Sequence, residues 1–204
     1  MNVYLMRHPA REGEAGLCIG QTDVALSAEG LSSLPRLGQE AEKVKPTRII
    51  SSDLQRCRIL AETIAGMRNL SVNINPEWRE LHFGDWENRT WDEIRHADPK
   101  RLAAWMNHYV EVAPPDGESF RQLQERALGA LHRLDRTAHE TIVVATHCGV
   151  IRALISAFSD VSLTRVFEIS VPYGSLTHLC WRDEKWALGS TVERTDNSVQ
   201  REVQ

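Results

Sequence analysis

The sequence has little that would point to a membrane or a nucleic acid as its partner. No apolar run approaches the length of a membrane-spanning helix, and the N-terminus lacks the pattern of a secretory signal peptide. Long basic runs are absent and the formal net charge is −4, so we expect no nucleic-acid partner. The 204 residues suit one domain, residues 1–204.

Cysteine and metal-ligand motifs are also scarce. The eight histidines are scattered, and neither a His-Glu-x-x-His motif nor a P-loop occurs. We therefore expect reduced thiols in a cytoplasmic protein, with no metal and no other cofactor. The four cysteines, none of them paired at metal-ligand spacing, are Cys18, Cys57, Cys148 and Cys180.

Two apolar stretches end in the same way. Val3–Met6 is followed at once by Arg7 and His8, and Ile142–Thr146 is followed by His147. Buried parallel strands show this pattern when they deliver polar side chains to a site at their carboxyl ends. We therefore predict that the two histidines meet at one edge of a sheet. The alternative for each is that it begins a solvated loop.

Strand and helix patterns alternate along the rest of the chain. We expect strands over 48–51 and 72–75, closing strands over 165–170, 175–182 and 185–188, and helices over about 27–41, 52–67, 119–139 and 149–158. The polar tail from Thr191 is expected to fray.

Two helix starts carry specific expectations. Pro35 predicts a kink or a later start of the first helix. Ser52 and Gln55 have the spacing of a capping box, which places Arg56 near the first turn of the second helix. Backbone N–H groups at such a turn favour an anion. Arg56 as an ordinary surface residue is the alternative.

The stretch from Trp78 to Phe120 differs from its surroundings. It holds four tryptophans, little strand pattern, and helical patterns near 91–96 and 99–108. We interpret it as a helical lid inserted into the α/β core, with the tryptophans as packing residues.

Arg7, His8, Arg56 and His147 together suggest a site for a compact anion. Two arginines and two histidines suit a phosphoryl group, because an arginine fork matches phosphate oxygens in bidentate fashion. Histidine can also attack phosphorus and become a covalent intermediate.

Such chemistry needs an acid for the leaving oxygen. Glu80, in an aromatic-rich segment, is the best candidate. Asp85 and Glu87 are rivals on spacing alone, and each of the three could be a solvated carboxylate.

Four blocks of the sequence resemble the signature blocks of the histidine phosphatase superfamily, also called the phosphoglycerate-mutase-like family. They occur in family order across nearly the whole chain, and they are Arg7–Pro9, Ser51–Cys57, Arg79–Glu87 and Ala145–Arg152. The resemblance implies a three-layer α/β/α sandwich with a mostly parallel central sheet and a helical lid at about 78–120.

The resemblance also implies roles for individual residues. His8 would be the phosphorylated nucleophile and Glu80 the proton donor. The phosphoryl group would be held by Arg7, Arg56 and His147. No metal is implied.

Within the superfamily, the chain is most similar to the α-ribazole phosphatases of cobalamin nucleotide-loop assembly. The stretches that carry this likeness are Cys18–Asp23, Phe83–Glu87, Ala104–Trp105 and Pro115–Phe120.

Two positions depart from the family pattern. Pro9 stands where Gly usually follows the nucleophile, and Glu14 stands where Asn is usual. Contacts from that loop to the phosphate are therefore open. The mutases also carry a tandem arginine in the insert, and none occurs in 78–120, which argues against a phosphoglycerate mutase.

The sequence thus predicts a phosphomonoesterase that acts on a small-molecule phosphate ester through phosphohistidine. The expected substrate is α-ribazole 5′-phosphate or a related precursor. The alternatives are a broad-specificity small-molecule or sugar phosphatase and, in another class, a non-catalytic phospho-ligand binding protein. The oligomeric state is left open, a homodimer included.

Overall fold

The computed structural model describes residues 1–13, 16–135 and 140–189. The strands of its main sheet are β1 (Asn2–Arg7), β3 (Arg48–Ser51), β4 (Val72–Ile74), β6 (Thr141–Thr146), β7 (Leu176–Arg182) and β8 (Lys185–Leu188). Within the described residues this sheet has the order β4-β3-β6-β1-β7-β8. The first four strands in that order are parallel, and β7 and β8 are antiparallel.

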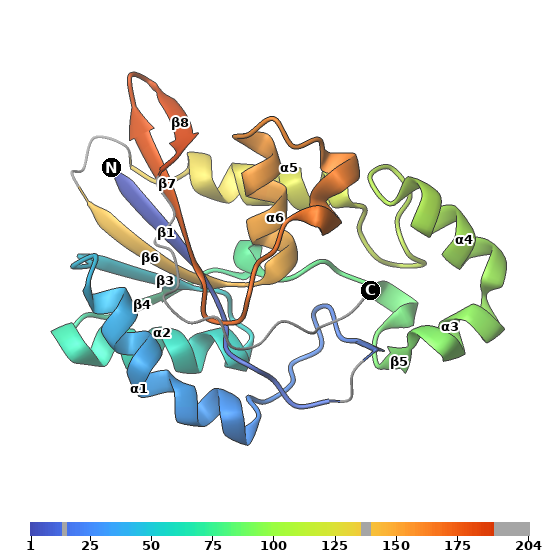
Figure 1. The fold of residues 1–204 in the computed structure, drawn as a ribbon, viewed down its shortest axis with the longest axis horizontal. Helices are drawn as coiled ribbons and strands as arrows, with labels where there is room; N and C mark the ends of the chain where they lie inside the picture. Colours follow the sequence, from blue (N-terminus) through green and yellow to red (C-terminus); the bar gives the residue numbers. More distant parts are fainter. Residues whose placement is uncertain (14–15, 136–139, 190–204) are drawn as a thin grey trace.

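Helices cover both faces of the sheet. The covering helices are α1 (Ala28–Glu42), α2 (Gln55–Arg68), α5 (Phe120–His132) and α6 (Cys148–Ala157). Figure 1 shows α1 and α2 on one face and α5 and α6 on the other. The predicted three-layer α/β/α sandwich with a mostly parallel sheet is confirmed.

The central strands are apolar because both of their faces are buried. On β1, Val3 and Leu5 pack in the core formed with α5 and α6, whereas Met6 packs in the core formed with α1 and α2. On β6, Val144 and Val143 divide between the two cores in the same way. The alternation follows from the two-residue period of a strand.

The chain changes face between two neighbouring strands. β1 leads to α1 on one face, and β6 leads to α6 on the other (Figure 1). Open α/β sheets bind ligands in the crevice at such a switch point, at the carboxyl ends of the strands. The register pairs Arg7 with Thr146, so His8 and His147 follow at the same edge. The predicted meeting of these two histidines is confirmed.

The segment 78–120 lies mostly to one side of the sandwich, where Figure 1 shows its helices in green at the right. Its elements, with the short helix that precedes it, are η1 (Pro76–Trp78), η2 (Gly84–Trp86), β5 (Arg89–Thr90), α3 (Trp91–Ala97) and α4 (Pro99–His108). The two predicted helices are present. β5 pairs with β2 (Leu17–Cys18). That this segment is a lid, and that the chain is one domain, stay predictions.

Three tryptophans of the segment 78–120 pack as expected, because Trp78, Trp86 and Trp105 are buried.

Among the described residues, no helix is both long and apolar enough to cross a bilayer.

The predicted capping box at Ser52 is wrong. α2 begins at Gln55, and the Ser52 hydroxyl instead accepts the N–H of Leu54 at 3.3 Å and lies 3.0 Å from a ring nitrogen of His147. The N–H of Gln55 donates at 2.7 Å to the carboxylate of Asp23, in the loop between β2 and α1. A residue distant in the sequence therefore caps this helix.

The predicted strand over 165–170 is also wrong. The chain there forms the 3₁₀ helix η3 (Leu163–Glu168), with Leu163 and Val166 buried three residues apart.

Two predictions about helix boundaries also differ from the structure. α5 ends at His132, short of the expected residue 139, and residues 136–139 lie outside the described part of the chain. α1 starts at Ala28 and includes Pro35, so the later start is not seen. The tail from Thr191 lies outside the described residues.

Candidate active site

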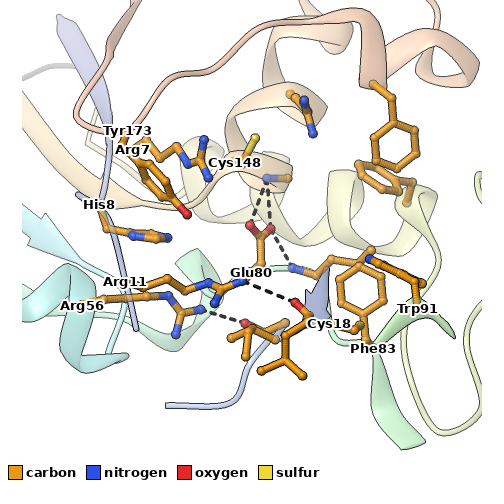
Figure 2. Close-up of a pocket in the computed structure, with 18 residues that line it drawn as sticks. Arg7, His8, Arg11, Cys18, Arg56, Glu80, Phe83, Trp91, Cys148 and Tyr173 are labelled. Carbon is orange, nitrogen blue, oxygen red and sulfur yellow. Dashed lines mark hydrogen bonds between the residues drawn. The ribbon is translucent and has the colours of Figure 1, made fainter. Parts of the chain in front are cut away.

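A pocket opens at the carboxyl ends of β1 and β6, and Figure 2 shows it in close-up. One end, called the histidine end below, is lined by Arg7, His8, Arg11 and Arg56. The other, called the aromatic end, is lined by Phe83, Trp91, Phe120 and Phe167. Glu80 lies between His8 and Trp91 in Figure 2.

His8 is held as the neutral tautomer that a nucleophile requires. Its Nδ1 lies 2.8 Å from the carbonyl oxygen of Pro9. A carbonyl can only accept, so Nδ1 carries the hydrogen and Nε2 keeps its lone pair. Burial, with the nearby charges of Arg56 and Arg7, holds the pKa of His8 well below its usual range. The Pro9 carbonyl makes this bond although proline replaces the family's usual glycine.

Arg7 is positioned by the segment that precedes β7. Its Nη1 donates to the carbonyl of Val171 at 2.6 Å, and its guanidinium carbon lies 3.8 Å from the ring centre of Tyr173. The Tyr173 ring also contacts that of His8, at 5.6 Å between centroids. The Nε of Arg7 is buried without a hydrogen-bond partner among the described residues. Such a group is matched by an anion.

Arg56 is almost fully buried, at 2% exposure, and two loop carbonyls orient it. Its Nη2 donates to Gly20 at 2.7 Å and its Nη1 to Thr22 at 2.8 Å. Gly20 has φ +51°, and a Cβ there would lie 2.8 Å from the carbonyl oxygen of Leu81. The interpretation of Arg56 as a surface residue is therefore wrong.

His147 lies beside His8 but does not line the pocket. The ring centroids are 5.1 Å apart in an edge-to-face arrangement. The Nε2 of His147 lies 3.0 Å from the Ser52 hydroxyl and 3.3 Å from the thiol of Cys57. Burial and the charge of Arg56 hold its pKa well below the usual range, so this ring is also neutral.

The carboxylate of Glu80 faces the N-terminus of α6. Its Oε1 accepts the N–H of Gly149 at 3.0 Å and that of Leu81 at 2.9 Å, as dashed lines in Figure 2 show. A Cβ on residue 149 would lie only 2.3 Å from Oε1, so glycine is what allows this approach. Residue 149 thereby fixes where the acid stands.

The backbone around Glu80 is held from behind by Arg126. This arginine donates to the carbonyls of Glu77, Arg79 and Glu80 at 2.7, 2.9 and 3.2 Å. It also pairs with Glu118 at 2.5 Å. These hydrogen bonds anchor the backbone segment that carries Glu80.

The two rival carboxylates do not line the pocket. Asp85 is exposed. Glu87 accepts the N–H of Gln21 at 2.8 Å and the hydroxyl of Thr22 at 2.5 Å, so it holds the loop between β2 and α1. Of the three candidates, Glu80 alone reaches the pocket.

Several pocket residues were not anticipated as site residues. Arg11 follows β1 by four residues, and its place in a loop after a strand was an available signal. Tyr173 and Phe167 lie in or near a segment that was predicted to be a strand. Arg152 lies one helical turn beyond Cys148, at the end of the family-like block Ala145–Arg152, but no role was predicted for it.

Among the described residues, no group of three or more His, Cys, Asp or Glu side chains is arranged to hold a metal ion. The positive charge of the pocket comes from its arginines. Glu14, at the family's usual Asn position, lies outside the described residues.

The match to known families is extensive. The model of the histidine phosphatase superfamily (branch 1) matches residues 3–193. The chain belongs to this superfamily. The resemblance seen in the sequence is therefore confirmed, and the protein is a phosphatase.

The relatives of this histidine phosphatase differ in the substrates their names give. It is 28% identical over 183 residues to the adenosylcobalamin/alpha-ribazole phosphatase of Salmonella typhimurium, covering 89% of this chain and 88% of the relative. It is 30% identical over 197 residues to the metal-independent phosphoserine phosphatase of Arabidopsis thaliana, covering 92% and 79%. The crystal structure of the alpha-ribazole phosphatase from Shigella flexneri matches with a TM-score of 0.84 at 26% identity, covering 98% and 100%.

Proposed function

We propose that this phosphatase hydrolyses a small-molecule phosphate monoester through a phosphohistidine on His8. The observation that carries the proposal is the bond from Nδ1 of His8 to the Pro9 carbonyl. It directs the lone pair to Nε2, on a neutral ring that lines a pocket with Arg7 and Arg56. A neutral imidazole beside fixed cations suits attack on a phosphoryl group.

In the first step, Nε2 of His8 attacks phosphorus. The N–P bond forms as the bond from phosphorus to the ester oxygen breaks. Arg7 and Arg56 stabilise the equatorial oxygens. Glu80 donates its proton to the departing oxygen, and the alcohol leaves. Oε1 of Glu80 accepts the N–H groups of Gly149 and Leu81 at 3.0 and 2.9 Å, whereas Oε2 accepts only that of Gly149, at 3.2 Å, so the proton to be donated is assigned to Oε2.

In the second step, water attacks the phosphoryl group on His8. Glu80, now a carboxylate, takes a proton from that water. The N–P bond breaks, phosphate leaves, and His8 is again neutral. One carboxyl group thus serves as acid and then as base, as microscopic reversibility requires.

His147 stays in the proposal as a ligand of the phosphoryl group. Its support is the 5.1 Å distance between its ring and that of His8. Because Nε2 faces Ser52, a direct contact requires the ring to turn or Nδ1 to serve as the donor. His147→Asn tests this, since loss of a phosphoryl ligand lowers kcat/KM for every ester to the same extent.

For the alcohol part, we propose a flat group that packs against the aromatic end. Phe83 and Trp91 meet edge to face at 5.8 Å, and Phe120 and Phe167 meet at 5.3 Å. Aromatic walls favour a ring over an open sugar. α-Ribazole 5′-phosphate, the ester implied by the relatives from Salmonella typhimurium and Shigella flexneri, has such a ring and is the first substrate to test. A broad small-molecule phosphatase is the alternative.

The experiment that tests the mechanism compares two leaving groups in Glu80→Gln. An alkoxide is strongly basic and needs the proton, whereas nitrophenolate hardly needs it. We expect phospho-enzyme formation from an alkyl phosphate to slow at least about a hundredfold, while formation from nitrophenyl phosphate changes little. Dephosphorylation slows with both esters, because Glu80 also activates water.

Asp85→Asn is the matched control, since Asp85 lies in the same segment but outside the pocket. It should keep wild-type rates. Equal slowing of phospho-enzyme formation from both esters in Glu80→Gln would make Glu80 a positioning residue. Binding of phosphate esters without turnover by the wild-type chain would support a non-catalytic binding protein instead.

A further inference from the structure

The pocket holds more positive charge than a phosphoryl group requires. Arg7, Arg11 and Arg56 gather at the histidine end, and their three positive charges already exceed the two negative charges of a phosphoryl dianion. A fourth arginine, Arg152, also lines the pocket. None of these four arginines takes part in an ion pair within the described residues.

Arg152 belongs to the aromatic end. Its guanidinium carbon lies 5.5 Å from the ring centre of Phe167, and its Nε donates to the carbonyl of Ile169 at 3.0 Å. The arginine is thus anchored on η3 and on the segment after it. The carbonyl bond uses one N–H, and the guanidinium has four more with which to meet a ligand.

Helix α6 carries both Arg152 and the residue that holds the acid. Gly149, which binds the Glu80 carboxylate, precedes Arg152 by three residues, so the two share one face of α6. The departing oxygen must lie at Glu80, because that group protonates it. Whatever is attached to this oxygen therefore extends toward the aromatic end and Arg152.

We propose that Arg152 binds an anionic group on the alcohol part of the substrate, either a carboxylate or a second phosphoryl group. This inference rests on the proposed function and narrows its substrate class. The preferred ester then has three parts: a phosphoryl group for the histidine end, a flat body for the aromatic walls, and an acidic group for Arg152. α-Ribazole 5′-phosphate by itself lacks the third part, whereas a nucleotide with a further phosphoryl group has it.

The test uses benzyl phosphates that differ only in the group at the far end of the ring. The neutral ester is 4-carbamoylbenzyl phosphate, and its carboxylate partner is 4-carboxybenzyl phosphate. A third ester, 4-(phosphonomethyl)benzyl phosphate, carries a phosphonate that cannot be hydrolysed and so represents the second phosphoryl group. All three leave as benzyl alcohols of similar basicity, so the ratio of kcat/KM values reports recognition and not leaving-group chemistry.

We expect the wild type to prefer at least one anionic ester over the neutral one by about tenfold or more, the scale of a charge-assisted hydrogen bond. In Arg152→Gln this ratio should fall close to one. Arg152→Lys, which keeps the charge without the guanidinium fork, should keep part of it. Arg101→Gln removes one exposed positive charge from α4, outside the pocket, and should keep the full ratio.

A wild-type ratio near one for both anionic esters would overturn the inference. This measurement uses only the wild-type protein, so it does not depend on whether a variant folds. A ratio that persists in Arg152→Gln would also overturn it. Failure of the proposed function looks different, because the wild type would then form no phosphohistidine from any of the three esters. Phosphohistidine formed without an anion preference would remove only the role of Arg152.

Discussion

The two ends of the pocket are built from different parts of the chain. At the histidine end, Arg7 is the last residue of β1, His8 follows it, and Arg56 lies in the first turn of α2. At the aromatic end, Phe83 and Trp91 come from the segment inserted between β4 and α5, and Phe167 comes from η3. The catalytic residues of the first end thus come from the edge of the parallel sheet and the helix after β3. Most of the aromatic walls of the second come from the inserted segment and η3, with Phe120 at the start of α5.

This difference separates chemistry from choice of substrate. A sheet edge holds its side chains rigidly, as transfer of a phosphoryl group requires. Short helices and loops can vary without disturbing the sheet. Changes at the histidine end should therefore affect every ester alike, and changes at the aromatic end should depend on the alcohol. The predictions below test that division.

The largest effect is expected for Arg56→Lys. The guanidinium is held by the carbonyls of Gly20 and Thr22, and lysine cannot bind them and a phosphoryl group with the same fork. We expect kcat/KM to fall by about 3 kcal/mol, or roughly a hundredfold, for every ester. Steady-state kinetics on one alkyl and one aryl ester measures this. A loss confined to one ester would break the division between the ends.

Stability should depend on pH through the histidine end. His8 and His147 both have pKa values held below 6.5 by burial, with Arg56 adding to the shift. Unfolding restores their ordinary pKa, so below about pH 6.5 the unfolded chain binds more protons than the folded chain. The stabilisation is fully present above that pH and is lost as pH falls, by up to about 2.7 kcal/mol per pH unit for two groups.

Denaturant unfolding between pH 7 and pH 5 measures this slope. His8→Asn should reduce it by up to about 1.4 kcal/mol per pH unit, the share of one group. His108→Asn, at an exposed position of α4, should leave it unchanged. A stability that stays level below pH 6.5 would mean that the two rings are not buried in the neutral form.

The smallest effect concerns the boundary between the two ends. In Gly149→Ala the new methyl group meets Oε1 of Glu80, so the carboxylate must move. We expect about a tenfold loss with an alkyl phosphate and little change in phospho-enzyme formation from nitrophenyl phosphate. Gly66→Ala is the matched control, because a Cβ on this glycine of α2 meets nothing within 4 Å. An equal loss on both esters would show that Gly149 does more than place the acid.

The sequence predicted the histidine end well for a physical reason. A buried parallel strand is apolar on both faces, so the polar residue that ends it stands out, as His8 and His147 do. The start of the second helix pointed to Arg56 and the aromatic-rich segment to Glu80, each with an alternative, and the family resemblance implied their roles. It could not show that Ser52 would meet His147 while Asp23 capped α2, because both contacts depend on loop geometry.

The aromatic end was predicted poorly because its residues look like ordinary core. Phe167 lies in a stretch with a strand-like composition that forms η3 instead. Arg152 is one of many helical arginines, and only the fold shows that it faces the pocket. Tertiary packing decided both outcomes, and local sequence pattern carries little information about it.

The central claim is that Nε2 of His8 carries the phosphoryl group. The direct measurement is to quench the wild-type protein during turnover of nitrophenyl phosphate under alkaline conditions, map the phosphopeptide by mass spectrometry, and assign the isomer by NMR. The account predicts phosphorylation at residue 8 on Nε2, and none in His8→Ala. Phosphate on Nδ1 of His8, on His147, or on no histidine during steady turnover would contradict it.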